Sequence, residues 1–153
     1  MKILVSACLL GENCKYSGGN NYNQAVCDFA RGHQVVPVCP EVLGGLPTPR
    51  CPAEIVQGVV TNKEGINVDR EFRAGAAKAL AIAKENGVEL AILQSRSPSC
   101  GVKEIYDGTF SGTKIPGQGG FAKMLMDEGV RVLDAGELPK IILKNEDGKC
   151  QSN

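Results

Sequence analysis

The chain opens with a short apolar run that ends directly in a cysteine: Lys2-Ile3-Leu4-Val5-Ser6-Ala7-Cys8. The pattern returns at Val35-Val36-Pro37-Val38-Cys39 and, with a longer turn before the thiol, at Ala91-Ile92-Leu93-Gln94 ahead of Cys100. Short apolar runs separated by helical patterns are typical of the buried strands of a parallel sheet. Ligands of open parallel sheets bind just outside the carboxyl ends of the strands. We therefore expect the three thiols to meet at one edge of the sheet.

The segments between and after these runs complete an alternating pattern. Asp69 is a good helix N-cap and Gly87 a good stop, and together they frame the clearest amphipathic stretch. We expect helices over 23–31, 70–86 and 119–128, a fourth strand over 130–134, and a small hairpin of residues 54–60 and 66–68 around the turn 62–65. The prediction is a single α/β domain over residues 1–144, with a Rossmann-like, open, mostly parallel sheet, flanking helices and a small hairpin insertion. A flexible polar tail over 145–153 follows.

The composition narrows the class of protein. A chain of 153 residues is long enough for one domain with a real core. Its 17 basic and 17 acidic residues balance, so we expect no nucleic-acid-binding surface. No apolar run reaches membrane-spanning length, and the first residues do not have the pattern of a secretory signal, so we expect a cytoplasmic protein without a membrane partner. In that compartment, seven cysteines indicate metal binding or catalysis more than disulfides.

The cysteines that follow the strands carry the strongest functional signal. A single free cysteine is more often a core residue than a ligand, but three in equivalent positions indicate a shared metal site with one position open. The chain has no CxxC pair, which disfavours a zinc ribbon, and thiolates from separate loops suit an iron–sulfur cluster, with zinc as an alternative. Cys14 could replace Cys39 as a ligand. Cys27 falls in a helix pattern, Cys51 lies near the expected site, and Cys150 lies in the tail.

Several polar residues neighbour these cysteines. Most glutamates are solvated, but Glu41 follows Cys39 and a proline, and could act as a general acid or base in the same cleft. Ser97 and Ser99 lie just before Cys100; loop serines usually form turns, yet these hydroxyls could orient a substrate or water. We expect Ser99 to contact the substrate.

Three further features are weaker signals. Arg50 and Arg96 could bind an anion or a carbonyl, although both could be ordinary surface charges, and we expect Arg50 to contact the substrate. Gly117-Gln118-Gly119-Gly120 before a helix resembles an anion-binding turn, which makes Gly119 a third candidate contact. His33, the only histidine, lies at a helix-to-strand junction away from the strand ends, so we assign it no catalytic role.

Five motifs, in order and spread over residues 2–133, resemble one family of iron–sulfur enzymes. They are Val5-Ser6-Ala7-Cys8-Leu9-Leu10-Gly11 with Cys14-Lys15-Tyr16, Pro37-Val38-Cys39-Pro40-Glu41, Gly44-Gly45-Leu46-Pro47-Thr48-Pro49-Arg50, Ser97-Pro98-Ser99-Cys100-Gly101 and Tyr106-Asp107-Gly108-Thr109-Phe110-Ser111-Gly112. The family is that of the thiouracil desulfidases, which remove sulfur from thiolated uracil or uridine. The chain differs from it at Cys51, where the family often has Pro, and at the helix start Gly119-Gly120-Phe121-Ala122-Lys123, where the family usually reads more like Gly-Val-Thr-Ala-Ala.

The resemblance implies a cofactor and roles for individual residues. The cofactor would be a [4Fe-4S] cluster held by three cysteines, which map to Cys8, Cys39 and Cys100, with one open iron. The catalytic pair would be Glu41 and Ser97. A soft thiocarbonyl sulfur suits an open, thiolate-bound iron, while Glu41 would move protons and Ser97 would hold the ring or the water.

The expected reaction is a hydrolytic, non-redox exchange of C=S for C=O. Its partners would be a small thiolated pyrimidine base or nucleoside and the hydrosulfide that leaves. Two alternatives stay open at this point: a sulfurtransferase that uses cluster-bound sulfide in the opposite direction, and a zinc or redox-sensing module without catalysis.

Overall fold

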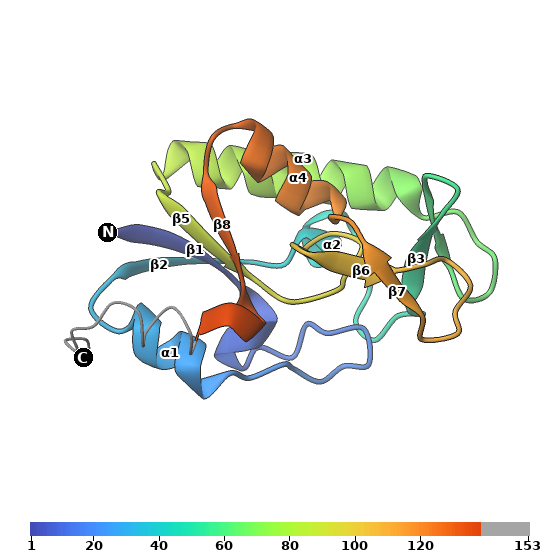
Figure 1. The fold of residues 1–153 in the computed structure, drawn as a ribbon, viewed down its shortest axis with the longest axis horizontal. Helices are drawn as coiled ribbons and strands as arrows, with labels where there is room; N and C mark the ends of the chain where they lie inside the picture. The colour runs from blue at the N-terminus through green and yellow to red at the C-terminus, as the bar shows by residue number, and fades with distance from the viewer. Residues whose placement is uncertain (139–153) are drawn as a thin grey trace.

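In the computed structural model, which describes residues 1–138, a parallel sheet lies between two layers of helices (Figure 1). The sheet has the order β2 (Gln34–Val38), β1 (Lys2–Ser6), β5 (Leu90–Leu93) and β8 (Arg131–Asp134). Because β1 pairs in parallel with both β2 and β5, the carboxyl ends of these three strands share one edge. The prediction of a Rossmann-like, mostly parallel α/β sheet with flanking helices is confirmed.

Alternating side chains of the sheet build a core on each face. Leu4 packs with α3 (Asp69–Glu85) and α4 (Gly120–Asp127) on one face. Ile3 and Val5 pack with α1 (Gln24–Ala30) on the other. Since both faces of β1 are covered, its central residues form a continuous apolar run, as expected for a buried parallel strand.

Two glycines allow a short helix to lie directly on α3. The short helix, α2 (Pro40–Leu43), begins with proline at its first position, which needs no N–H there. A Cβ on Gly75 of α3 would stand 1.8 Å from the Pro40 carbonyl oxygen, and one on Gly44 would stand 2.0 Å from the Glu71 carbonyl oxygen. Only glycine at both positions permits this close backbone contact, which fixes α2 and therefore Glu41.

Two small antiparallel hairpins lie beside the main sheet (Figure 1). They are β3 (Ala53–Val56) with β4 (Val59–Asn62), and β6 (Glu104–Tyr106) with β7 (Lys114–Pro116). A hairpin in the first region was expected, and its predicted turn at 62–65 is present, where Thr61 bridges Asn67 in antiparallel fashion. The regular strands β3 and β4, however, meet at an earlier reversal that was not expected. The chain reverses at Gln57 and Gly58, whose φ angles of 50° and 81° are those of a tight two-residue hairpin turn. The second hairpin was not expected.

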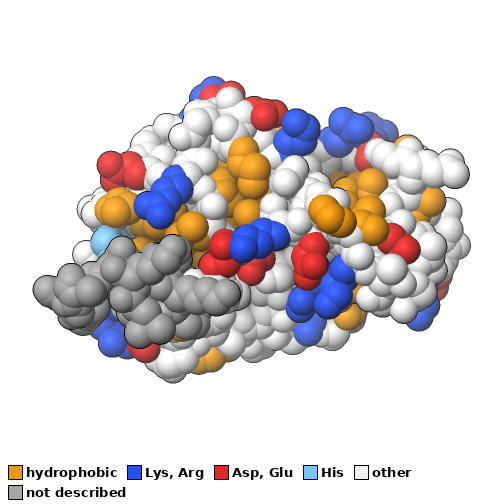
Figure 2. All heavy atoms as spheres, in the orientation of Figure 1, with side chains coloured by type: hydrophobic (Ala, Val, Ile, Leu, Met, Phe, Trp, Pro, Cys, Tyr) orange, Lys and Arg blue, Asp and Glu red, His pale blue; other side chains and the backbone are white. Residues whose placement is uncertain are grey.

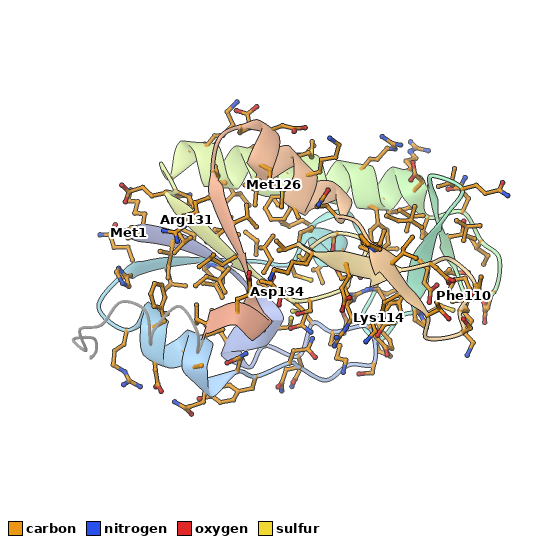
Figure 3. The ribbon with its side chains drawn as sticks, in the orientation of Figure 1. Met1, Phe110, Lys114, Met126, Arg131 and Asp134 are labelled. Atoms are coloured by element: carbon orange, nitrogen blue, oxygen red, sulfur yellow. The ribbon has the colours of Figure 1, made fainter. Side chains whose placement is uncertain are left out.

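The two hairpins are joined through one carboxylate. Glu54 Oε1 of β3 accepts hydrogen bonds from the Gly108 N–H at 3.0 Å and from the Phe110 N–H at 3.1 Å. Gly108 also approaches the Ile55 carbonyl oxygen so closely that a Cβ would stand 2.6 Å from it. The loop between β6 and β7 is therefore held against β3, and it places Phe110 at the hairpin end of the molecule (Figure 3).

The boundary of α3 differs slightly from the expected one. The helix begins at Asp69, and Val68 rather than Asp69 is its N-cap. The Asp69 carboxylate instead accepts a hydrogen bond from the Val60 N–H at 3.0 Å and pairs with Arg73. Burial raises the pKa of Asp69, but these two contacts outweigh it and hold the pKa below its ordinary value.

No helix within residues 1–138 combines the length and apolarity that crossing a bilayer requires. The face of the molecule in Figure 2 carries basic and acidic side chains interspersed, in keeping with the balanced charge of the sequence. The predicted polar tail, 145–153, and the domain boundary at 144 lie outside the described residues.

Candidate metal centre and active site

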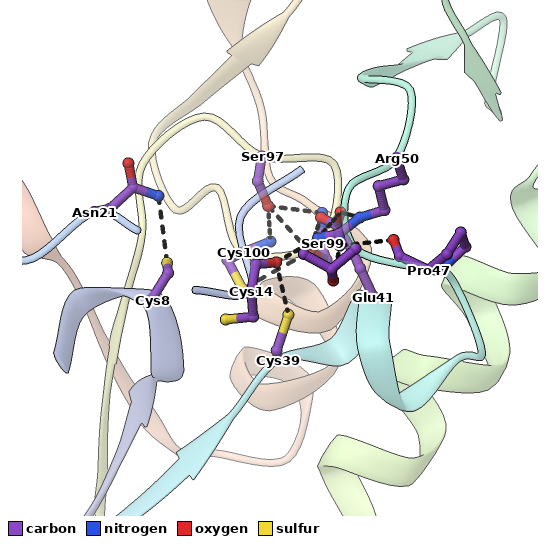
Figure 4. Close-up of polar contacts among 11 residues, drawn as sticks. Cys8, Cys14, Asn21, Cys39, Glu41, Pro47, Arg50, Ser97, Ser99 and Cys100 are labelled. Atoms are coloured by element: carbon purple, nitrogen blue, oxygen red, sulfur yellow. Dashed lines mark hydrogen bonds and ion pairs between the residues drawn. The ribbon is translucent and has the colours of Figure 1, made fainter. Parts of the chain in front are cut away.

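A cavity of about 440 Å³ opens at the carboxyl edge of the sheet. This volume lies within the range of small-molecule sites. Among the residues that line it are four cysteines: Cys8, Cys14, Cys39 and Cys100 (Figure 4). The sheet thus brings together the three cysteines expected from the strand ends, and it adds Cys14.

Each of the three thiols takes its place from the end of a strand. Cys8 lies in a 3₁₀ helix, η1 (Ala7–Leu10), that follows β1 directly. Cys39 is the N-cap residue of α2, just after β2. Cys100 follows β5 after a tight loop and is buried, with 5% of its surface exposed. Cys14 comes from the loop after η1.

The thiols on the β1 and β2 side interact with one another. Hydrogen bonding by the Cys14 thiol lowers the pKa of Cys8 to about 7 and that of Cys39 to about 6, and it raises the pKa of Cys14 above its ordinary value. The Asn21 side-chain N–H also donates to the Cys8 sulfur at 3.3 Å. Burial raises the pKa of Cys100 to about 12, although hydrogen bonds with neighbouring serines act in the opposite direction.

The arrangement of donors favours a cluster over a single ion. No three His, Cys, Asp or Glu side chains among residues 1–138 are arranged to hold one metal ion. A [4Fe-4S] cluster does not need such an arrangement, because each cysteine binds a different iron. The described cavity lining supplies several thiols, the donors that hold iron–sulfur clusters.

Glu41 stands at the cavity with both carboxylate oxygens occupied. It lies in the first turn of α2, two residues after Cys39. Its Oε1 accepts a hydrogen bond from Arg50 Nε at 3.0 Å, and its Oε2 accepts one from the Ser99 hydroxyl at 3.0 Å. The Glu41 side chain keeps 15% of its surface exposed, so it borders the cavity without being free in water.

The guanidinium of Arg50 makes four hydrogen bonds, all to other groups of the protein. Besides Glu41, its guanidinium donates to the Pro47 carbonyl at 3.2 Å, the Thr48 hydroxyl at 3.0 Å and the Cys14 carbonyl at 2.8 Å. Only 7% of the side chain is exposed. Arg50 borders the cavity as expected, but the structure directs its donors at the protein.

The two serines differ in position. Ser97 Oγ accepts hydrogen bonds from the Ser99 N–H at 3.1 Å and the Cys100 N–H at 2.7 Å, and it lies 3.0 Å from Ser99 Oγ. Ser97 is half-buried at the cavity wall, whereas Ser99 is 3% exposed. Both serines line the cavity, and Ser97 is the more exposed of the two.

The start of α4 holds this serine loop. The N–H groups of Gly119 and Gly120 donate to the carbonyls of Gly101 and Pro98, at 2.9 and 2.8 Å. A Cβ on Gly119 would stand 2.5 Å from the Ser99 carbonyl carbon. The expected anion-binding turn thus offers these N–H groups to loop carbonyls instead. Gly119 is not among the described residues that line the cavity.

The remaining residues considered from the sequence lie partly at the cavity and partly away from it. Arg96 lines the cavity in a left-handed backbone conformation with φ of 67°, and His33 stacks on Phe29 away from it. Cys27 and Cys51 are half-buried and do not line the cavity. Sequence reasoning did not single out the cavity-lining residues Asn21, Lys63 and Phe72 or assign roles to Tyr106 and Phe110, although the motif Tyr106–Gly112 contains the last two.

Comparisons with known proteins agree on one family. The family model described as 2-thiouracil desulfurase matches residues 3–137. The chain is 41% identical over 150 residues to the uncharacterized protein YbbK of Bacillus subtilis (strain 168), which covers 92% of this chain and 99% of that protein. It is 40% identical to a solved structure titled [4Fe-4S]-dependent thiouracil desulfidase TudS, with a TM-score of 0.84 over 94% of this chain and 96% of that one.

Proposed function

The chain belongs to the 2-thiouracil desulfurase family, and from this premise we propose that it is a [4Fe-4S]-dependent thiouracil desulfidase. The enzyme exchanges the sulfur of a thiolated uracil or uridine for oxygen. One water supplies the oxygen of the new C=O bond, the C–S bond breaks, and the two protons of the water balance the sulfide that leaves. We retain the cytoplasm as its compartment, because thiolate ligands persist in a reducing environment.

The proposed ligands of the cluster are Cys8, Cys39 and Cys100. Their support is the donor set, since thiols from three separate strand ends line one cavity. Three ligands leave one iron open. Cys14 is the alternative third ligand, because it lines the same cavity beside Cys39. Full iron content in Cys39→Ser together with iron loss in Cys14→Ser would assign the third ligand to Cys14.

When bound, a cluster with an open iron supplies a soft Lewis acid for a thiocarbonyl sulfur. The protein supplies the proton chemistry. The Glu41 carboxylate, at the cavity wall, accepts a proton from the attacking water and returns one to the departing sulfur or the ring nitrogen. The Ser97 hydroxyl, fixed by two backbone N–H groups, orients the ring or the water.

One observation carries the proposal: the four thiols, Glu41 and Ser97 line a single cavity at the edge of the sheet. The first test is the visible spectrum, iron and acid-labile sulfide of protein purified without air. Brown protein that converts thiouracil to uracil with one hydrosulfide per turnover supports the desulfidase. Colourless zinc protein, or sulfur that moves only into a thiolated product, would support one of the alternatives.

The role of Glu41 has its own test. Glu41→Gln keeps the size and hydrogen bonding of the side chain but cannot exchange a proton. We expect it to retain iron and substrate binding while turnover falls by about 10² or more, the scale of a lost general acid–base. Glu85→Gln, an exposed position on α3, is the matched control. Near-normal turnover by Glu41→Gln would mean that protons travel through water alone.

A further inference from the structure

We propose that Arg50 and Ser99 are positioning residues for Glu41 and do not bind the substrate. The inference rests on the proposed function and deepens it, because it assigns each carboxylate oxygen of Glu41 to one dedicated partner. Both residues border the cavity, so sequence reasoning had placed them with the substrate. The hydrogen bonds of both side chains, however, are directed at Glu41 and at other acceptors of the protein.

Arg50 fixes the first oxygen. Its Nε and one terminal nitrogen both lie 3.0 Å from Glu41 Oε1. The same guanidinium binds the Cys14 carbonyl at 2.8 Å, and the Arg50 N–H donates to the Tyr16 carbonyl at 2.7 Å. A guanidinium has five N–H donors in a rigid plane, and four hydrogen bonds to protein acceptors leave little for a ligand. Arg50 thus locks the carboxylate to the loop that carries Cys14.

Ser99 fixes the second oxygen and connects it to Ser97. The Ser99 hydroxyl has one proton, and its nearer acceptor is Glu41 Oε2 at 3.0 Å, against 3.8 Å to the Cys100 sulfur. Ser97 Oγ already accepts two backbone N–H groups, so its own proton is available for Ser99 Oγ at 3.0 Å. The donors then run in one direction, from Ser97 through Ser99 to Glu41. Ser99 therefore sets the orientation of both groups that we assign to catalysis.

Burial and backbone contacts limit how much of Ser99 a substrate can reach. The residue is 3% exposed, whereas Ser97 is half-buried. Its carbonyl accepts the N–H groups of Phe121 and Ala122 at 3.0 and 3.1 Å, so the start of α4 holds it in place. A rigid, buried hydroxyl between two catalytic groups is suited to orienting them, and its removal should affect turnover more than binding.

The test compares Ser99→Ala and Arg50→Lys with the parent and with Glu41→Gln. Positioning predicts that kcat falls by roughly 10-fold to 10²-fold, the scale of one hydrogen bond to a charged group. KM, iron content and the calorimetric affinity for uracil should stay within about 2-fold, the size of an ordinary surface substitution. In the Glu41→Gln background, Ser99→Ala should cost almost nothing further, because coupled residues are not additive. The matched controls are Ser111→Ala, which removes an exposed hydroxyl outside this chain of contacts, and Arg31→Lys, which alters an exposed ion pair with Asp28 at the C-terminal end of α1.

Two results would overturn the inference. The first is a raised KM and weakened uracil binding with kcat preserved, which is the behaviour of substrate ligands. The second is a full, additive loss when Ser99→Ala joins Glu41→Gln. Failure of the proposed function looks different, because then the parent releases no hydrosulfide from thiouracil, or Glu41→Gln alone is fully active.

Discussion

Replacing Gly75 by Ala should both destabilise the protein and impair catalysis. In an ordinary helix interior this change stabilises by about 0.5–1 kcal/mol. At this position in α3, however, the new Cβ would stand 1.8 Å from the Pro40 carbonyl oxygen and 2.9 Å from the Gly44 nitrogen. These are backbone atoms of α2 and its C-cap, so no side chain can rotate out of the way.

The magnitude follows from the distance. Carbon and oxygen need roughly 3.5 Å of separation, so α2 and α3 must part by roughly 1.5 Å. Forcing atoms into a packed core costs about 1–3 kcal/mol, which outweighs the gain in helix propensity. Since α2 carries Glu41 and begins next to Cys39, the shift also reaches the site. A misplacement of about 1 Å can cost on the order of 10² in rate.

Thermal and urea unfolding followed by circular dichroism measure the first effect, and hydrosulfide release measures the second. We expect a melting temperature lower by roughly 5 °C and a clear loss of kcat. Gly120→Ala is the matched control, because a Cβ at this first position of α4 meets no atom within 4 Å. Its unfolding free energy should stay within about 0.5 kcal/mol of the parent. A Gly75→Ala protein as stable and active as the parent would refute the reasoning.

Three further predictions test other parts of the molecule. Replacing any one of the three proposed cluster ligands by Ser should abolish iron retention, whereas Cys27→Ser on α1 should leave the iron content unchanged. Glu54→Ala removes the acceptor shared by two backbone N–H groups of the 107–113 loop. Amide hydrogens of this loop should therefore exchange faster in the variant than in the parent, while those of the main sheet should not change. Equal protection of the loop in parent and variant would contradict this. Asp69→Asn should lower the unfolding free energy at neutral pH, because a carboxyl with a lowered folded-state pKa stabilises the protein only while it is ionised. The difference in unfolding free energy between parent and variant should therefore shrink as the pH falls through the pKa of Asp69. A difference that stays constant across acid pH would argue against this role.

The sequence was sufficient to predict the parallel sheet and the convergence of its cysteines. Apolar runs such as Ile3-Leu4-Val5 predict buried strands because both faces need cover, and a parallel sheet sends all carboxyl ends to one edge. The alternative roles of Cys14 could not be separated in this way. Its place in the cavity depends on a loop without periodicity, which Arg50 holds from 36 positions further along the chain.

The parts that sequence reasoning missed depend on tertiary contacts. No helix was expected over residues 40–43, yet α2 forms there, and Gly44 and Gly75 let it lie directly on α3. Gln57-Gly58 is a weaker turn signal than the Asn62–Gly65 segment, and the chain reverses at both, so only the second turn was predicted. The partners of Glu41 lie 9 and 58 residues away in sequence, so no local pattern could reveal that its carboxylate is held on both sides.

The strand order has a consequence for the way the holoprotein is assembled. The thiols proposed as ligands belong to residues 8, 39 and 100, and β1 at the centre must pair with β2 and then with β5 before they face one another. During synthesis, the three proposed ligands are all present only after residue 100 of the 153 has been added. The two apolar cores that cover the sheet are built from side chains of the protein alone, so we expect the sheet to persist in the apoprotein. Cluster binding to that folded state should then raise its free energy of unfolding, which unfolding of apoprotein and holoprotein side by side would measure.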